Sequence, residues 1–127
     1  LNIVNPDAER IEQKTKADLE KYQKEILNKQ KSTKTDGEWA LIADTLYNDL
    51  NQFWWDNTND ALYQANRVQN DADVVKLFQA FGYRTPHYFG IPMSPQPLNV
   101  YLKDRMSTAY MTELNNAYRN KGIKFQY

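Results

Sequence analysis

Two short aromatic segments contain the residues best suited to recognition. In the first, Trp54 and Trp55 stand side by side and precede Asp56. Because adjacent residues of a helix or tight turn point in different directions, we expect only one of the two rings in the core. The other ring is expected to be exposed or to cover the 83–96 loop or the N-terminal helix. An exposed indole is typical of a protein interface, a sugar-stacking platform or a membrane interface.

The second segment, Tyr83 to Phe89, interleaves aromatic and basic side chains on the longest expected loop. Stacking on nucleic-acid bases would use such residues, but no cluster of Lys and Arg surrounds them and the formal net charge of the chain is zero. A protein-binding loop is one interpretation, and a plug of aromatic rings at the open end of a helix bundle is the other. The candidate interaction residues are Trp54, Trp55, Arg84, His87, Tyr88 and Phe89.

Signals for catalysis, metals and cofactors are weak. The chain has no cysteine and a single histidine, which excludes thiolate zinc sites, thiol nucleophiles and multi-histidine metal sites. His87 lacks an identifiable nucleophile or carboxylate partner, and no phosphate-binding glycine loop, G-x-S-x-G or H-E-x-x-H motif occurs. Asp56 and Asp60 are a conceivable hydrolase pair, but their positions favour capping of a helix start. We predict a non-enzymatic protein with no catalytic residue, metal or cofactor.

The neutral total conceals three differently charged segments. Residues 1–36 carry +1, residues 37–73 carry −6 with Arg67 as their only basic residue, and residues 74–127 carry +5. The acidic and basic halves either pack together and neutralise each other, or form a dipolar surface that orients a charged partner or a neighbouring copy.

The first segment has the pattern of a charged helix. No Gly or Pro occurs from Asp7 to Lys31, Pro6 suits a first helical position, and a narrow apolar stripe recurs at steps of three and four residues. The stripe consists of Ala8, Ile11, Thr15, Leu19, Tyr22 and Ile26. We predict a helical stalk or linker over residues 1–36, acting as a spacer or as a coiled-coil oligomerisation helix, with partial disorder as the alternative. The polar run 31–37 predicts a hinge before the next domain.

Residues 37–127 predict one domain of five short amphipathic helices. The expected ranges are 38–53, 58–69 with Thr58 as its cap, 72–81 ended by Gly82, a helix from Pro97 to Met106, and a helix capped by Ser107 and closed by Gly122. We expect an irregular loop over 83–96, and a short tail over 123–127 that either pairs as an extended strand or lies over the bundle. No series of strands is found, so the expected fold class is all-α.

Several of these helical segments resemble a single divergent annexin-type repeat over about residues 38–123. The resemblance rests on the segments 43–50, 60–62, 72–82, 98–106 and 113–117. It implies a compact five-helix right-handed superhelix. In annexins a glycine-rich turn and a later carboxylate bind calcium, but here the matching turn 52–60 carries bulky residues and 94–100 contains no acid. The resemblance therefore implies the fold without calcium-dependent phospholipid binding.

These patterns predict a structural or adaptor module that contacts a protein partner, or a second copy of itself, through the stalk or the aromatic surface. Nucleic-acid binding is not expected. The sequence begins with Leu1, which fits a processed or truncated product tethered by upstream residues to a bacterial envelope or a phage assembly. One alternative is a peripheral membrane or cell-surface binder in which Trp54 or Trp55 inserts. The second is a small hydrolase with a site near His87.

Overall fold

The computed structural model describes the backbone of residues 6–52 and 54–127 and the side chains of residues 17–52 and 54–127. Most of this part of the chain is helical, which confirms the helical class expected from the sequence. The helices are α1 (Pro6–Lys29), α2 (Asp36–Asp49), α3 (Thr58–Ala65), α4 (Asp71–Phe81), α5 (Leu98–Arg105) and α6 (Thr108–Asn120). The strands are β1 (Tyr83–Arg84), β2 (His87–Tyr88), β3 (Ile91–Pro92) and β4 (Gln96–Pro97). No described helix is both long and apolar enough to cross a membrane.

Small polar side chains fix where the helices begin. Thr35, Asn70 and Ser107 cap α2, α4 and α6 by accepting hydrogen bonds from backbone N–H groups of the first turns. The expectation that Thr58 caps α3 is wrong, because Asn57 accepts the bond from the Asp60 N–H and Thr58 is already helical. Both α2 and α3 end earlier than expected, and Phe53, the expected end of the first, lies outside the described residues.

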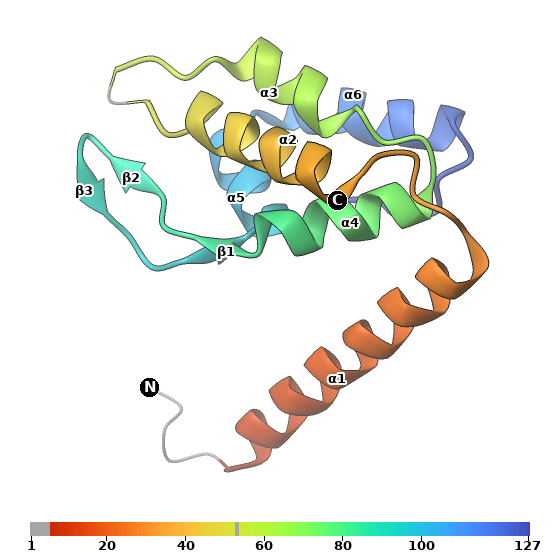
Figure 1. Cartoon of the computed structure of the whole chain (residues 1–127). Coiled ribbons are helices and arrows are strands. Elements are labelled where there is room, and N and C mark those ends of the chain that lie inside the picture. The colour runs from red at the N-terminus through yellow and green to blue at the C-terminus, as the bar shows by residue number, and fades with distance from the viewer. Residues whose placement is uncertain (1–5, 53) are drawn as a thin grey trace.

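α2 packs against both α3 and α4 (Figure 1). Its apolar face is buried together with large side chains from α5 and α6. The core positions with almost no exposed surface include Trp39, Ile42, Leu46, Leu50, Leu77, Phe81, Leu98, Tyr101, Leu102, Leu114 and Tyr118. The Tyr101 hydroxyl donates to the Tyr47 carbonyl, and the Tyr118 hydroxyl donates to the Ala65 carbonyl, so the two buried phenols also link the helices.

The 83–97 segment is not the irregular loop that was expected. β1 pairs with β4, and β2 pairs with β3, both antiparallel, so the segment doubles back on itself. Phe89 and Gly90 form the turn between β2 and β3, and both have positive φ angles, 52° and 80°. A two-residue hairpin turn with two positive φ angles matches the twist of its strands, which explains why a segment with four prolines still forms this pairing.

The C-terminal tail lies over the bundle, which is one of the two expected alternatives. The Phe125 ring meets Phe78 edge-on at 5.2 Å between centroids, and the Tyr127 ring stacks on Phe78 at 6.0 Å. Backbone N–H groups of Lys124 and Phe125 donate to the Asp71 carboxylate, and the Tyr127 N–H donates to Asn115. The tail therefore joins the start of α4 to α6.

α1 contacts α4 and extends away from the rest of the chain (Figure 1). Ala8, Ile11 and Thr15 of the expected apolar stripe lie outside the residues whose side chains are described. Leu19 and Tyr22 are exposed, and Ile26 is half-buried.

The polar run expected to act as a hinge is held by hydrogen bonds to the buried Asp73 carboxylate. Asp73 Oδ1 accepts from the Ser32 hydroxyl at 2.8 Å and from the Thr33 N–H at 2.7 Å. Asp73 Oδ2 accepts from the Thr33 hydroxyl at 2.6 Å and from the Gln69 N–H at 2.9 Å. Burial alone would raise the pKa of Asp73, but these bonds hold that pKa below its usual value.

Candidate interaction surface

Two connections meet at one end of the molecule, the 50–57 segment between α2 and α3 and the β2–β3 hairpin (Figure 1). Asn51 joins them. Its Oδ1 accepts from the His87 N–H at 2.7 Å, and its Nδ2 lies 3.2 Å from Nδ1 of His87. In the tautomer that carries the proton on Nε2, Nδ1 accepts a second hydrogen bond from the same amide. The histidine is thus held as a structural link between the two connections.

Large apolar side chains are exposed on both connections. We call the group made by Trp54, Trp55, Phe89, Ile91 and Met93 the aromatic end. Trp54 and Trp55 are 71% and 84% exposed, and the three hairpin residues are between 48% and 68% exposed. The expectation that one indole fills the core is wrong. Leu50, at the end of α2, is fully buried whereas both indoles are exposed, and the Asn57 N–H donates to the Asp49 carbonyl at 2.7 Å, which joins the two ends of the connection.

Two arginines in or beside the 83–97 segment, Arg84 and Arg105, make internal contacts. Arg84 pairs with Asp44 at 2.8 Å, and its Nε donates to the Phe81 carbonyl. The Arg105 guanidinium lies over the Tyr88 ring at 4.2 Å, and its Nη2 donates to the His87 carbonyl at 2.6 Å. Of the six candidate interaction residues, Trp54, Trp55 and Phe89 therefore belong to the exposed surface, while Arg84, His87 and Tyr88 hold the 83–97 segment in place.

Ile91 and Met93 were not predicted as interaction residues, because residues 83–96 were expected to form an irregular loop. The local signal that could have found them is Gly90 alone, because a glycine suits the second position of a two-residue hairpin turn, whereas Phe89 does not favour the first. Asn51 and Arg105 had no local signal, because their partners lie 36 and 18 residues away.

The base of the 50–57 segment carries a pair of carboxyl groups, Asp49 and Asp60. Asp49 is 9% exposed, and its Oδ2 has no hydrogen-bond partner among the described residues. Burial, followed by the contact with Asp60, raises the pKa of Asp49 to about 7. Asp56, the other member of the pair considered from the sequence, accepts a hydrogen bond from the Gln52 N–H at 3.2 Å. In the described part of the chain, no group of three or more His, Cys, Asp or Glu residues could hold a metal ion.

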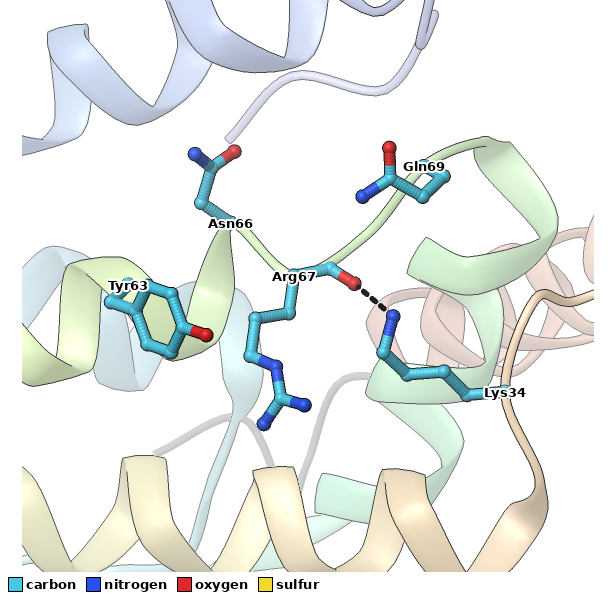
Figure 2. Close-up of a pocket in the computed structure, with 5 residues that line it drawn as sticks. All are labelled: Lys34, Tyr63, Asn66, Arg67 and Gln69. Atoms are coloured by element: carbon cyan, nitrogen blue, oxygen red, sulfur yellow. Dashed lines mark hydrogen bonds between the residues drawn. The ribbon is translucent and has the colours of Figure 1, made fainter.

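A polar pocket of about 270 Å³ lies beside the 66–70 connection between α3 and α4 (Figure 2). It is lined by Lys34, Tyr63, Asn66, Arg67 and Gln69. The Lys34 ammonium donates to the Arg67 carbonyl at 2.9 Å, the bond drawn in Figure 2. Two cations from separate connections thus face one small space.

An apolar groove of about 520 Å³ lies between α1, α4 and the C-terminal tail. Its apolar lining includes Leu19, Tyr22, Ile26, Val74, Val75, Phe78 and Phe125. The described half of the α1 stripe therefore faces this open groove as well as solvent.

A comparison of the chain with protein-family models, with curated proteins and with solved structures found no significant match. The functional proposal therefore depends on the geometry of these surfaces.

Proposed function

We propose that the chain is a non-enzymatic adaptor or structural module that binds another protein through the aromatic end. In this proposal residues 1–36 form a stalk, and residues 37–127 form a five-helix domain of the annexin-repeat type without its calcium site. The described helices α2 to α6 all lie within residues 36–127. The observation that carries the function is the exposure of five large apolar side chains, from 48% to 84%, on two connections that Asn51 holds together.

Surface composition supports a protein partner. Isolated exposed apolar residues are normal, whereas a group of them marks an interaction site. Trp, Phe and Met are enriched at protein interfaces, and an indole that becomes buried on binding is a frequent centre of the binding energy. The link through Asn51 and His87 limits the motion of both connections, which lowers the entropy lost on binding.

The charges near the aromatic end favour a protein over an anionic membrane. Binding to anionic lipid needs exposed Lys or Arg beside the inserting rings. Here Arg84 and Arg105 make internal contacts, and the charged residue next to the indoles is Asp56. A carboxylate at this position would oppose a negatively charged surface.

The decisive experiment is site-specific cross-linking followed by a binding measurement. A photoreactive phenylalanine analogue at position 55 captures the partner from the source organism, and the identified protein is then purified. We expect the Trp54→Ala/Trp55→Ala variant to bind it about 100-fold more weakly than the wild-type chain, as for interface centres. Leu41→Ala is the matched control, since Leu41 is a 66% exposed apolar residue of α2 that does not belong to the aromatic end, and it should bind like the wild type.

Each other outcome has a defined meaning. If the captured protein is a second copy of the chain, sedimentation velocity should show wild-type dimers and monomers of the double variant. Equal binding by the double variant and the wild type overturns the proposal. So does the absence of any cross-link together with tryptophan-dependent binding to phosphatidylcholine or phosphatidylserine vesicles, which would establish the membrane alternative.

A further inference from the structure

Three cations from distant parts of the sequence converge on the connection between α3 and α4. Lys34 lies before α2, Arg67 lies in the connection itself, and Lys121 follows α6. Arg67 is the only basic residue between positions 37 and 73, a stretch with seven carboxylates. Arg67, the one cation of the acidic segment 37–73, therefore lies close to Lys34 and Lys121 from the segments on either side.

Lys121 is fully occupied by the fold. Its ammonium donates to the Asn66 carbonyl at 2.5 Å, to Asn66 Oδ1 at 2.9 Å and to the Val68 carbonyl at 2.8 Å. An ammonium has three N–H donors, so none remains for a ligand. Lys121 thus fixes the backbone at the back of the pocket and adds positive charge to it.

Lys34 and Arg67 retain donors that can reach a ligand. The Lys34 ammonium makes one hydrogen bond, to the Arg67 carbonyl, and lies 5.2 Å from the centre of the Trp39 ring. Arg67 donates from Nη1 to Gln64 at 3.2 Å, while a guanidinium has five N–H donors. Figure 2 shows both side chains below the connection, with the Lys34 ammonium directed at the Arg67 carbonyl and the Arg67 guanidinium pointing away from the connection. The lining of this pocket contains no carboxylate.

The positive charges here are incompletely compensated. The pKa of Lys121 is lowered, first by burial and then by the charge of Lys34, with Asp73 acting in the opposite direction. Asp73 already accepts four hydrogen bonds from neutral groups, from Ser32, Thr33 and Gln69. A bound anion would relieve the repulsion between the cations without replacing an existing contact.

We propose that the Lys34–Arg67 pocket binds a small oxyanion, specifically the phosphate group of a small phosphate monoester. A guanidinium matches two phosphate oxygens at once, and an ammonium supplies a second charged donor. The pocket volume of about 270 Å³ exceeds that of a phosphate group, which leaves room for a small organic substituent. The Tyr63 ring lines that space, is 61% exposed, and lies 5.7 Å from the Arg67 guanidinium, so it offers a face for the substituent.

Calorimetric titration of the whole chain at constant ionic strength tests the proposal. The probes are phenyl phosphate, inorganic phosphate and acetate. We expect saturable binding of phenyl phosphate with a Kd of about 1 mM or below, weaker binding of inorganic phosphate, and no saturation by acetate. Tyr63→Ala should make the first two probes bind equally. Equal binding of the two phosphates to the wild-type chain would instead overturn the monoester and leave inorganic phosphate as the ligand.

Charge variants decide whether the binding occurs in this pocket. Arg67→Gln should weaken phenyl phosphate binding about 10-fold or more, and Lys34→Gln should weaken it by a smaller factor. Lys103→Gln is the matched control, because Lys103 is an exposed cation on α5. Thermal unfolding of each variant verifies folding, and Arg67→Gln changes a half-buried polar side chain that is not part of the hydrophobic core. The absence of saturation at about 10 mM, or an unchanged Kd in Arg67→Gln, overturns the proposal. These variants leave the aromatic end intact, so this test and the partner test fail independently.

Discussion

The two connections that flank α2 differ from what their hydropathy suggests, because the polar one is bonded to the core and the aromatic one is exposed. The connection before α2 is polar, yet Ser32 and Thr33 bond to the buried Asp73. The connection after α2 is rich in aromatic residues, yet Trp54 and Trp55 are 71% and 84% exposed. A polar segment is ordered where each polar group has a partner, and an apolar segment stays outside where the core positions are already filled.

A buried carboxyl group lies at each of the two connections, Asp73 of α4 at the first and Asp49 of α2 at the second, and their pKa values shift in opposite directions. Asp73 is 0% exposed and accepts four hydrogen bonds, which lower its pKa despite burial. Asp49 is 9% exposed, faces Asp60, and has an oxygen without a hydrogen-bond partner among the described residues. Burial is common to both, so the difference in pKa reflects the neighbours of each carboxyl group.

Asp73→Ala should produce the largest loss of stability. It leaves the Ser32 hydroxyl, both donors of Thr33 and the Gln69 N–H without their acceptor. We expect the free energy of unfolding to fall by about 3–5 kcal/mol, measured by urea denaturation. Asp44→Asn is the control, because Asp44 is an exposed partner of Arg84 and its loss should cost less than about 1 kcal/mol. Equal losses in the two variants would contradict this account of the connection.

Ser32→Ala should have the next largest effect. The Ser32 hydroxyl donates to Asp73 and accepts from the Trp39 Nε1–H at 2.8 Å, so its removal leaves a buried indole N–H without a partner. We expect a loss of about 2 kcal/mol in the same measurement. Thr35→Ala is a useful comparison, since it removes only the α2 cap and should cost about 1 kcal/mol. A smaller loss in Ser32→Ala than in Thr35→Ala would contradict the role given to the Ser32–Trp39 bond.

Local patterns predicted much of the fold because the helix signals are local. Ser107 and Gly82 lie at the expected helix boundaries, and the spacing of Trp39, Ile42 and Leu46 predicted a buried face. The polar run before α2 was expected to be a hinge because its partners are not local. Asp73 lies 41 residues from Ser32, and no spacing rule relates positions that far apart.

The candidate site was also predicted only where its signal is local in the sequence. The Trp54-Trp55 pair is visible in the sequence, but the exposure of both rings is not, because exposure depends on how the helices pack and not on local spacing. Arg84 was predicted to be an interaction residue, but it forms an ion pair with Asp44 and donates a hydrogen bond to the Phe81 carbonyl. The Lys34–Arg67 pocket was not predicted from the sequence, because its lining residues come from the connection before α2, from α3 and from the connection after α3.

Asp49→Asn should have a smaller effect that depends on pH. The folded chain binds the Asp49 proton more tightly than the unfolded chain, with a pKa of about 7 against the usual 3.8. The stabilisation from this proton is full below pH 3.8 and is lost as the pH rises through 7. We therefore expect the variant to gain about 1 kcal/mol relative to the wild type between pH 5 and pH 8, measured by thermal unfolding. Asp60→Asn should act in the same direction, and a difference that is constant with pH would contradict the carboxyl pair.

Trp54→Ala and Trp55→Ala should have the smallest effects on stability. With 71% and 84% of their surfaces exposed, the two rings contribute little to the core, and each substitution should change the free energy of unfolding by less than about 0.5 kcal/mol. Trp39→Ala is the opposing control, because the same residue type is 1% exposed there and its loss should cost about 3–5 kcal/mol. The comparison separates residue type from position: if Trp54→Ala were as destabilising as Trp39→Ala, the exposed rings would be structural, and the aromatic end would lose its basis as a binding surface.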